Sequence, residues 1–165
     1  MDIFKSIPII LVLISATACS MVGRIEEVRP DPSGVTVNNH HSGRIIVRVA
    51  GGDDQFVSRA TFQQALIDSI NATKVFESAA SSGNTPYELR VMTLEKRHSG
   101  LGYDHWTSTE WMLRDSKGTE IWRQKIKAKG HAIHFGGTDR FRSSAERSSR
   151  AVISVGIKAL GELKF

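Results

Sequence analysis

The chain has 165 residues, of which 40% are hydrophobic and 24% are charged, and its formal net charge is +5. These values are typical of a single globular domain and exclude an intrinsically disordered chain. The single cysteine excludes an internal disulfide, so the fold must be held by a packed core.

The first element is an apolar run, Ile7–Ala18, in the stretch "SIPIILVLISATACSM". At about 12 residues it is too short to cross a bilayer, since a spanning helix needs roughly 20. The length suits the apolar region of a secretory signal, which precedes small residues at a cleavage site. The basic segment expected before it is weak, because Asp2 offsets Lys5. Cys19, the only cysteine of the chain, follows directly.

The residues before Cys19 resemble the lipobox of bacterial lipoproteins. Thr17 and Ala18 match its pattern, whereas Ala16 stands where that family usually has leucine. In that family the signal is cut just before the cysteine, whose sulfur and new amino group are then acylated. The resemblance implies that residues 1–18 are a cleaved lipoprotein signal peptide and that Cys19 is the lipid attachment site. An ordinary cleaved signal followed by an incidental cysteine is the alternative.

Lipidation would hold the protein on a membrane. Each buried methylene contributes ~0.8 kcal/mol, so one acyl chain binds marginally and two or more bind stably. The lipobox implies three chains, palmitate among them. Ser20 follows the cysteine in place of aspartate, which by the lipoprotein sorting rule implies the periplasmic face of the outer membrane, with the inner membrane as the alternative. A basic domain on a membrane favours an acidic partner, either an envelope protein or an anionic glycolipid, over nucleic acid.

The first half of the exported chain predicts a tether, a strand and a helix. Segment 19–43 contains prolines, glycines and the polar run "NNHHSG" with little periodicity, which predicts a lipid-anchored tether. The alternation in "RIIVRVA" predicts a strand over Arg44–Ala50 with one buried face. After a break at "GGDD", apolar residues recur every three or four positions and predict a helix over Gln55–Thr73.

The second half predicts three strands and a final helix. The small and polar residues of Ser78–Pro86 predict a loop, and alternation over Tyr87–Arg97 predicts a strand. A second loop follows over His98–Asp104. The sequence "DSKGT" predicts the turn of a hairpin at Asp115–Thr119. An apolar stripe at helical spacing predicts a helix over Asp139–Leu163.

The turn sets the hairpin register by pairing Asp115 with Thr119. The next expected pairs are Arg114 with Glu120, Leu113 with Ile121, Met112 with Trp122, and Trp111 with Arg123. One face then gathers the residues expected in the core: Trp106, Met112, Trp122 and Ile126. The other face gathers alternating cations and a neighbouring aromatic residue: Arg123, Lys125, Lys127, Lys129 and Trp111. We predict that this basic strand face binds the acidic partner; a solvated face whose lysines discourage edge-to-edge aggregation is the alternative.

The order strand–helix–strand–strand–strand–helix predicts one α+β domain over residues 44–165. We expect a small mixed or antiparallel sheet of about four strands, with both helices on one face.

The sequence lacks recognisable catalytic motifs. "HAIH" has no glutamate of the zinc-protease type, "GLGYDH" lacks the third glycine of a dinucleotide fingerprint, and no GxSxG occurs. We therefore expect no enzyme, no cofactor and no bound metal. A metal-dependent envelope hydrolase that uses His98, His105 and His131 is a weaker alternative.

In element order and in the phrases "KVFES…YELRV" and "DSKGTEIWRQ", the domain is similar to small envelope accessory lipoproteins. Examples are the lipopolysaccharide-assembly lipoprotein LptE and the auxiliary lipoproteins of ABC-type lipid transporters. This resemblance implies a non-enzymatic accessory or docking subunit of a lipid or lipopolysaccharide transport or assembly complex. A periplasmic carrier of lipid or glycolipid is the alternative, and it predicts an apolar cavity behind Trp106, Met112 and Trp122.

Overall fold

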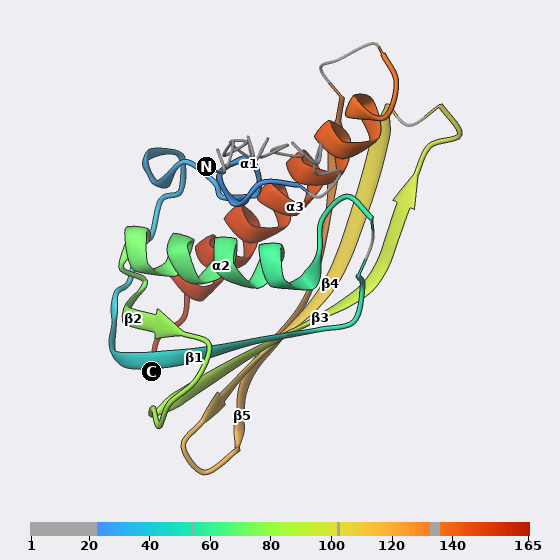
Figure 1. Cartoon of the computed structure of the whole chain (residues 1–165). Coiled ribbons are helices and arrows are strands. Elements are labelled where there is room, and N and C mark those ends of the chain that lie inside the picture. Colours follow the sequence, from blue (N-terminus) through green and yellow to red (C-terminus); the bar gives the residue numbers. More distant parts are fainter. Residues whose placement is uncertain (1–22, 54, 102, 133–135) are drawn as a thin grey trace, which may run out of the picture.

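The computed structural model describes residues 23–165 except 54, 102 and 133–135, so the predicted signal peptide and Cys19 lie outside the described residues. The elements are α1 Ile25–Val28, the 3-10 turn η1 Pro32–Gly34, β1 His41–Ala50, α2 Arg59–Thr73, β2 Phe76–Ala80, β3 Tyr87–His98, β4 Asp104–Asp115, β5 Glu120–His131 and α3 Asp139–Leu160. As predicted, α2 and α3 pack on one face of the sheet (Figure 1). The α+β class is confirmed, with five strands in place of about four.

The sheet is mixed and has the strand order β2-β1-β3-β4-β5. Strand β1 is parallel to both of its neighbours, and β3, β4 and β5 form an antiparallel meander. Helix α2 connects β1 to β2. This helix begins at Arg59 rather than Gln55, because the Ser58 hydroxyl caps it by accepting a hydrogen bond from Thr61 N–H (3.1 Å). Helix α3 ends at Leu160 rather than Leu163.

Strand β2 is not predicted from the sequence, and it overlaps the expected loop Ser78–Pro86. Its alanines and serine have weak strand propensity. In the structure β1 pairs with it on one edge, and a side chain of α2 binds it as well. Asn71 Nδ2 donates to the Ala79 carbonyl (3.2 Å), and Ala79 N–H donates to Asn71 Oδ1 (2.7 Å). Tertiary contacts therefore hold a segment whose own sequence favours a loop.

The core lies between the sheet and the two long helices. Trp111 of β4 is its largest fully buried side chain, and the indole packs against α3 at Gly156. The indole Nε1 donates to Thr109 Oγ1 (2.8 Å), which satisfies its polar atom inside the core. Within the described residues, no helix combines the length and the apolar character that a membrane crossing requires.

Residues 23–40, expected to be part of a tether, pack on the domain. Val28 of α1 is fully buried, and Val35 is nearly so. Gly23 N–H donates to the Phe56 carbonyl, and Arg24 N–H donates to Glu146 Oε1 (3.2 Å). Helix α1 contacts both α2 and α3. The folded domain therefore begins upstream of the predicted boundary at residue 44.

The hairpin β4–β5 departs from the predicted register. Arg114 pairs with Glu120 as expected, but the register shifts between Leu113 and Arg114. Leu113 then lies opposite Trp122, Met112 opposite Arg123, and Trp111 opposite Gln124. Ile121 is the extra residue of this bulge.

A shift of one residue moves every side chain of a strand to the other face. Trp106 and Met112 therefore lie on the face away from the helices, which corrects their predicted place in the core, and Trp111 lies inside. The core positions predicted for Trp122 and Ile126 are confirmed: Ile126 is 3% exposed, and Trp122 packs against the core.

Candidate functional site

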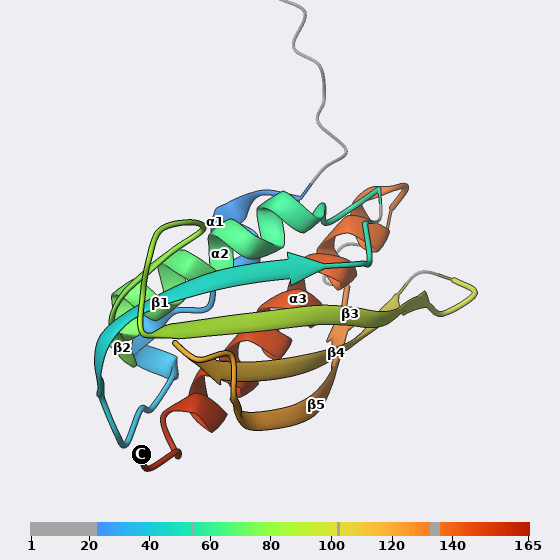
Figure 2. The same cartoon turned by 90° about the horizontal axis from the view of Figure 1, so that it is seen from below.

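The candidate site is the open face, which we define as the face of β1, β3, β4 and β5 opposite α2 and α3. Figure 2 shows these strands side by side, with the helices behind them. Basic side chains outnumber acidic ones on this face. The arginine and lysine residues are Arg44, Arg48, Arg90, Arg97, Arg114, Arg123, Lys125, Lys127 and Lys129. The acidic residues are Glu88, Glu95, Asp104, Glu110 and Glu120.

Four cations form a basic strip along β5, and all of them are exposed as predicted: Arg123, Lys125, Lys127 and Lys129. The ends of the strip are paired. Arg123 Nη1 lies 2.8 Å from Glu110 Oε2, and Lys129 Nζ lies 2.9 Å from Asp104 Oδ2. Among the described residues, no ion pair is found for Lys125 or Lys127. The middle of the strip therefore has two cations that form no short ion pair with the carboxylates of the described residues, although Glu110 is the cross-strand partner of Lys125.

The paired ends of the strip change the ionisation of their carboxylates. The Arg123 guanidinium, by hydrogen bonding, holds the pKa of Glu120 below its usual value. Hydrogen bonds from His131 and then Lys129 lower the pKa of Asp104 in the same way. These carboxylates therefore stay ionised over a wider pH range.

Trp111, predicted beside the basic strip, lies on the opposite face and is fully buried. The tryptophan beside the basic strip on the open face is Trp106. The Trp106 ring lies between two cations, with the Arg97 guanidinium carbon 5.0 Å and Lys129 Nζ 5.4 Å from the ring centroid. One signal in the sequence points to this arrangement, because Glu110 and Arg114 share the alternation of Trp106 and Met112 and are charged.

A shallow arginine groove of about 720 Å³ crosses the open face beside the basic strip. Its charged lining is formed by Arg48, Arg90, Arg114, Glu88 and Glu110, and its apolar lining includes Met92 and Met112. The Arg48 guanidinium lies 3.6 Å from Glu88, and Arg90 donates a hydrogen bond to the same carboxylate. The Met92 side chain is half exposed. The sequence does not predict this groove, because β1, β3 and β4 meet only in the folded sheet.

The three histidines named for the hydrolase alternative do not form one group: His98 and His105 contact each other, whereas His131 lies on the other face of the sheet. His105 is buried on the core side, where its Nδ1 lies 2.6 Å from Ser148 Oγ, and its ring contacts that of His98. His131 is on the open face, where its Nδ1 lies 2.8 Å from Asp104 Oδ1. In the part of the chain that the structure describes, no group of three or more His, Cys, Asp or Glu residues is placed to hold a metal ion.

Neither a family model nor a curated protein matches the sequence. Solved structures do match the fold. Protein XCC0632 of Xanthomonas campestris, of the family DUF330, is 9% identical with a TM-score of 0.61, and the match covers 81% of this chain and 90% of that chain. A PelC dodecamer from Paraburkholderia phytofirmans gives 12% identity, a TM-score of 0.52, and coverage of 82% and 95%. The protein CT253 of Chlamydia trachomatis gives 7% identity, a TM-score of 0.52, and coverage of 74% and 98%.

At these identities the matches show a shared fold. The chain has the architecture of the DUF330 protein and of PelC over most of its length. The finer resemblance to LptE and to transporter auxiliary lipoproteins stays a prediction.

Proposed function

We propose that this chain is a bacterial envelope lipoprotein, anchored in the outer membrane through lipid on Cys19. Its domain acts as a non-enzymatic docking subunit of a complex that transports or assembles lipid or lipopolysaccharide. The observation that carries this proposal is the open face, on which a basic strip borders a groove lined by arginine and methionine.

The composition of the open face favours docking over simple solvation. Arginine, methionine and tryptophan are enriched at protein interfaces, whereas a merely solvated strand face needs only small polar residues and lysine. Met92, which lines the groove with these arginines, is about half exposed, at 50%. A partner that covered Met92 would remove apolar area from water, which stabilises a complex by ~25 cal/mol per Å² before the costs of association.

The positions of Trp106 and Met112 support docking over the lipid-carrier alternative. A carrier was expected to hold lipid in a cavity behind these residues, between helix and sheet. Both residues are on the open face instead. The space behind the sheet at this point is filled by Trp111, which packs against Gly156.

The test is fractionation and crosslinking in cells. We expect wild-type protein in the membrane fraction, labelled by palmitate, with a specific protein partner recovered after crosslinking. The Cys19→Ala variant should not be labelled by palmitate, should leave the membrane fraction and should give no crosslinked partner. Equal membrane retention of the two proteins would refute the anchor. Recovery of stoichiometric lipid without a protein partner would favour the carrier.

A further inference from the structure

The folded chain is fixed close to the proposed lipid. Gly23 and Arg24 are both held by backbone hydrogen bonds, to the Phe56 carbonyl and to Glu146. Cys19 precedes Gly23 by only four residues, and an extended chain spans at most 3.3–3.6 Å per residue, or about 14 Å over this distance. A lipid on Cys19 therefore keeps the start of α1 near the bilayer surface.

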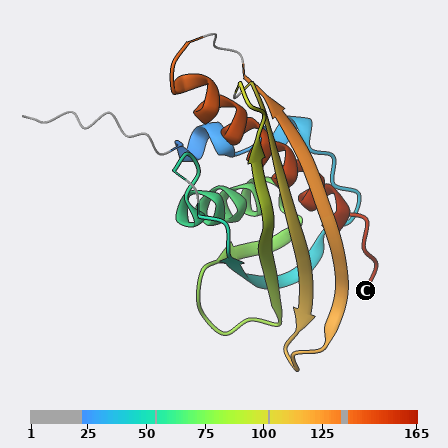
Figure 3. The same ribbon diagram turned by 90° about the vertical axis from the view of Figure 1, so that its right-hand side faces the viewer.

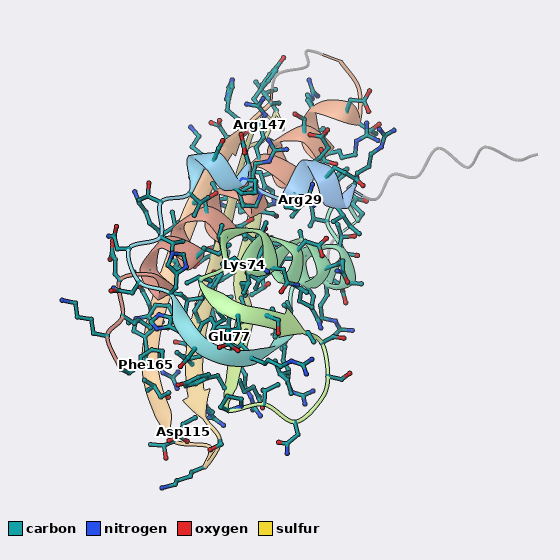
Figure 4. The ribbon with its side chains drawn as sticks, turned by 90° about the vertical axis from the view of Figure 1, so that its left-hand side faces the viewer. Arg29, Lys74, Glu77, Asp115, Arg147 and Phe165 are labelled. Atoms are coloured by element: carbon teal, nitrogen blue, oxygen red, sulfur yellow. The ribbon has the colours of Figure 1, made fainter. Side chains whose placement is uncertain are left out.

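The start of α1 is on the helical side of the molecule. Helix α1 packs on α2 and α3, and Figure 3 shows α3 between α1 and the strands β4 and β5. Figure 4 faces this side and labels Arg29 at the end of α1. A helix layer is about 10–12 Å thick, so the open face lies on the far side of the molecule from the anchor point. With the lipid in the membrane, the helices face the bilayer and the open face points into the aqueous phase.

We propose that the open face docks an acidic surface of a protein partner, which approaches from the side opposite the bilayer. This inference rests on the proposed function and names the partner of the same surface. The orientation keeps lipid headgroups of the anchoring bilayer away from the open face. A second copy bound through the same face would bring two basic strips together, which costs energy through like-charge repulsion. Charge complementarity therefore selects an acidic protein.

The two parts of the open face have different roles in this docking. Lys125 and Lys127 form no ion pair within the described residues, and they attract acidic groups of the partner and raise the association rate. The arginine groove receives an apolar side chain of the partner against Met92 and Met112. Contacts that are buried in this way mainly set the dissociation rate.

The orientation is tested with the lipidated full chain in vesicles of phosphatidylethanolamine and phosphatidylglycerol. Acylation occupies the only native thiol, so an introduced cysteine is the single site for a fluorescent label. Arg29→Cys marks the helical side and Lys127→Cys marks the basic strip. A nitroxide quencher on the lipid headgroups should quench the label at position 29 and leave that at position 127 nearly unchanged. Equal quenching at both positions would overturn the orientation.

The partner is tested by a photo-crosslinking amino acid placed in cells at Met112, with exposed Gln64 of α2 as the matched control. We expect position 112 alone to give an adduct with one acidic protein. That protein, once purified, should bind the wild-type chain. Its affinity for the double variant Lys125→Glu, Lys127→Glu should be lower by roughly tenfold or more, because both substitutions replace attraction of the acidic partner by repulsion.

Other adducts decide against the inference. A lipid adduct, an adduct with a second copy, or no adduct at position 112 would overturn it. A protein adduct at position 64 alone would overturn it as well and leave the proposed docking function intact. Failure of the anchor itself would appear separately, as membrane retention of Cys19→Ala.

Discussion

Trp111 and Gly156 form a close contact between sheet and helix. A Cβ atom on Gly156 would collide with the indole ring, so α3 can approach β4 only with glycine at this position. Gly156→Leu should therefore lower the free energy of unfolding by about 1–3 kcal/mol through overpacking. Urea unfolding, followed by circular dichroism, measures this change in the unlipidated Cys19→Ala chain. Val155→Ala, at an exposed neighbouring position, should stay within about 0.5 kcal/mol. An unchanged midpoint for Gly156→Leu would show that this packing is loose.

Burial raises the pKa of the Glu146 carboxyl above its usual value, although the hydrogen bond from Arg24 N–H opposes the shift. The folded state thus holds this proton more tightly than the unfolded state. The stability it contributes is complete below pH 4.5, the usual value, and is lost as pH rises through the raised pKa. Glu146→Gln keeps the acceptor without the charge and should raise the free energy of unfolding near neutral pH only. Urea unfolding below pH 4.5 and near neutral pH measures this change, with exposed Glu26→Gln as control. An equal increase in the free energy of unfolding at both pH values would contradict the raised pKa of Glu146.

At the scale of elements, β2 is held by one side chain of α2 in addition to its pairing with β1. Asn71→Ala removes both hydrogen bonds to Ala79 and should cost about 1–3 kcal/mol, because the strand's buried polar groups lose their partner. Hydrogen exchange should increase at Ala79 more than in β3. Gln64→Ala, which removes only a bond to Asp68 on the surface of the same helix, is the control and should change little. Faster exchange in β3 than in β2 would indicate global destabilisation instead.

The same elements show how far the sequence predicts the structure. Alternation placed β1, β3 and the cations of β5 correctly, because each pattern is complete within one strand. The side of β4 was assigned wrongly because it was inferred through the turn, and the bulge at Ile121 inverted it. Strand β2 and the arginine groove depend on partners from distant segments, and no local pattern contains them.

At the scale of the whole molecule, two opposing effects act on the proposed orientation. The basic open face is attracted to anionic headgroups, by about 1 kcal/mol per cation close to the surface. If Cys19 carries the proposed lipid, the short connection between Cys19 and Gly23 opposes this contact by holding α1 at the membrane. In the proposed orientation, the short connection therefore outweighs the attraction of the open face to the headgroups.

Lengthening the connection should reverse the orientation. An insertion of about ten glycine and serine residues after Met21 adds a mean reach of roughly 16–19 Å, enough for the domain to turn. The label at Lys127→Cys should then be quenched by headgroup nitroxides in vesicles that contain phosphatidylglycerol. Vesicles of phosphatidylcholine alone should show no such quenching, because they lack the attracting charge. If the label on the lengthened chain stays unquenched on anionic vesicles, contacts between the helical side and the bilayer, rather than the short connection, fix the orientation.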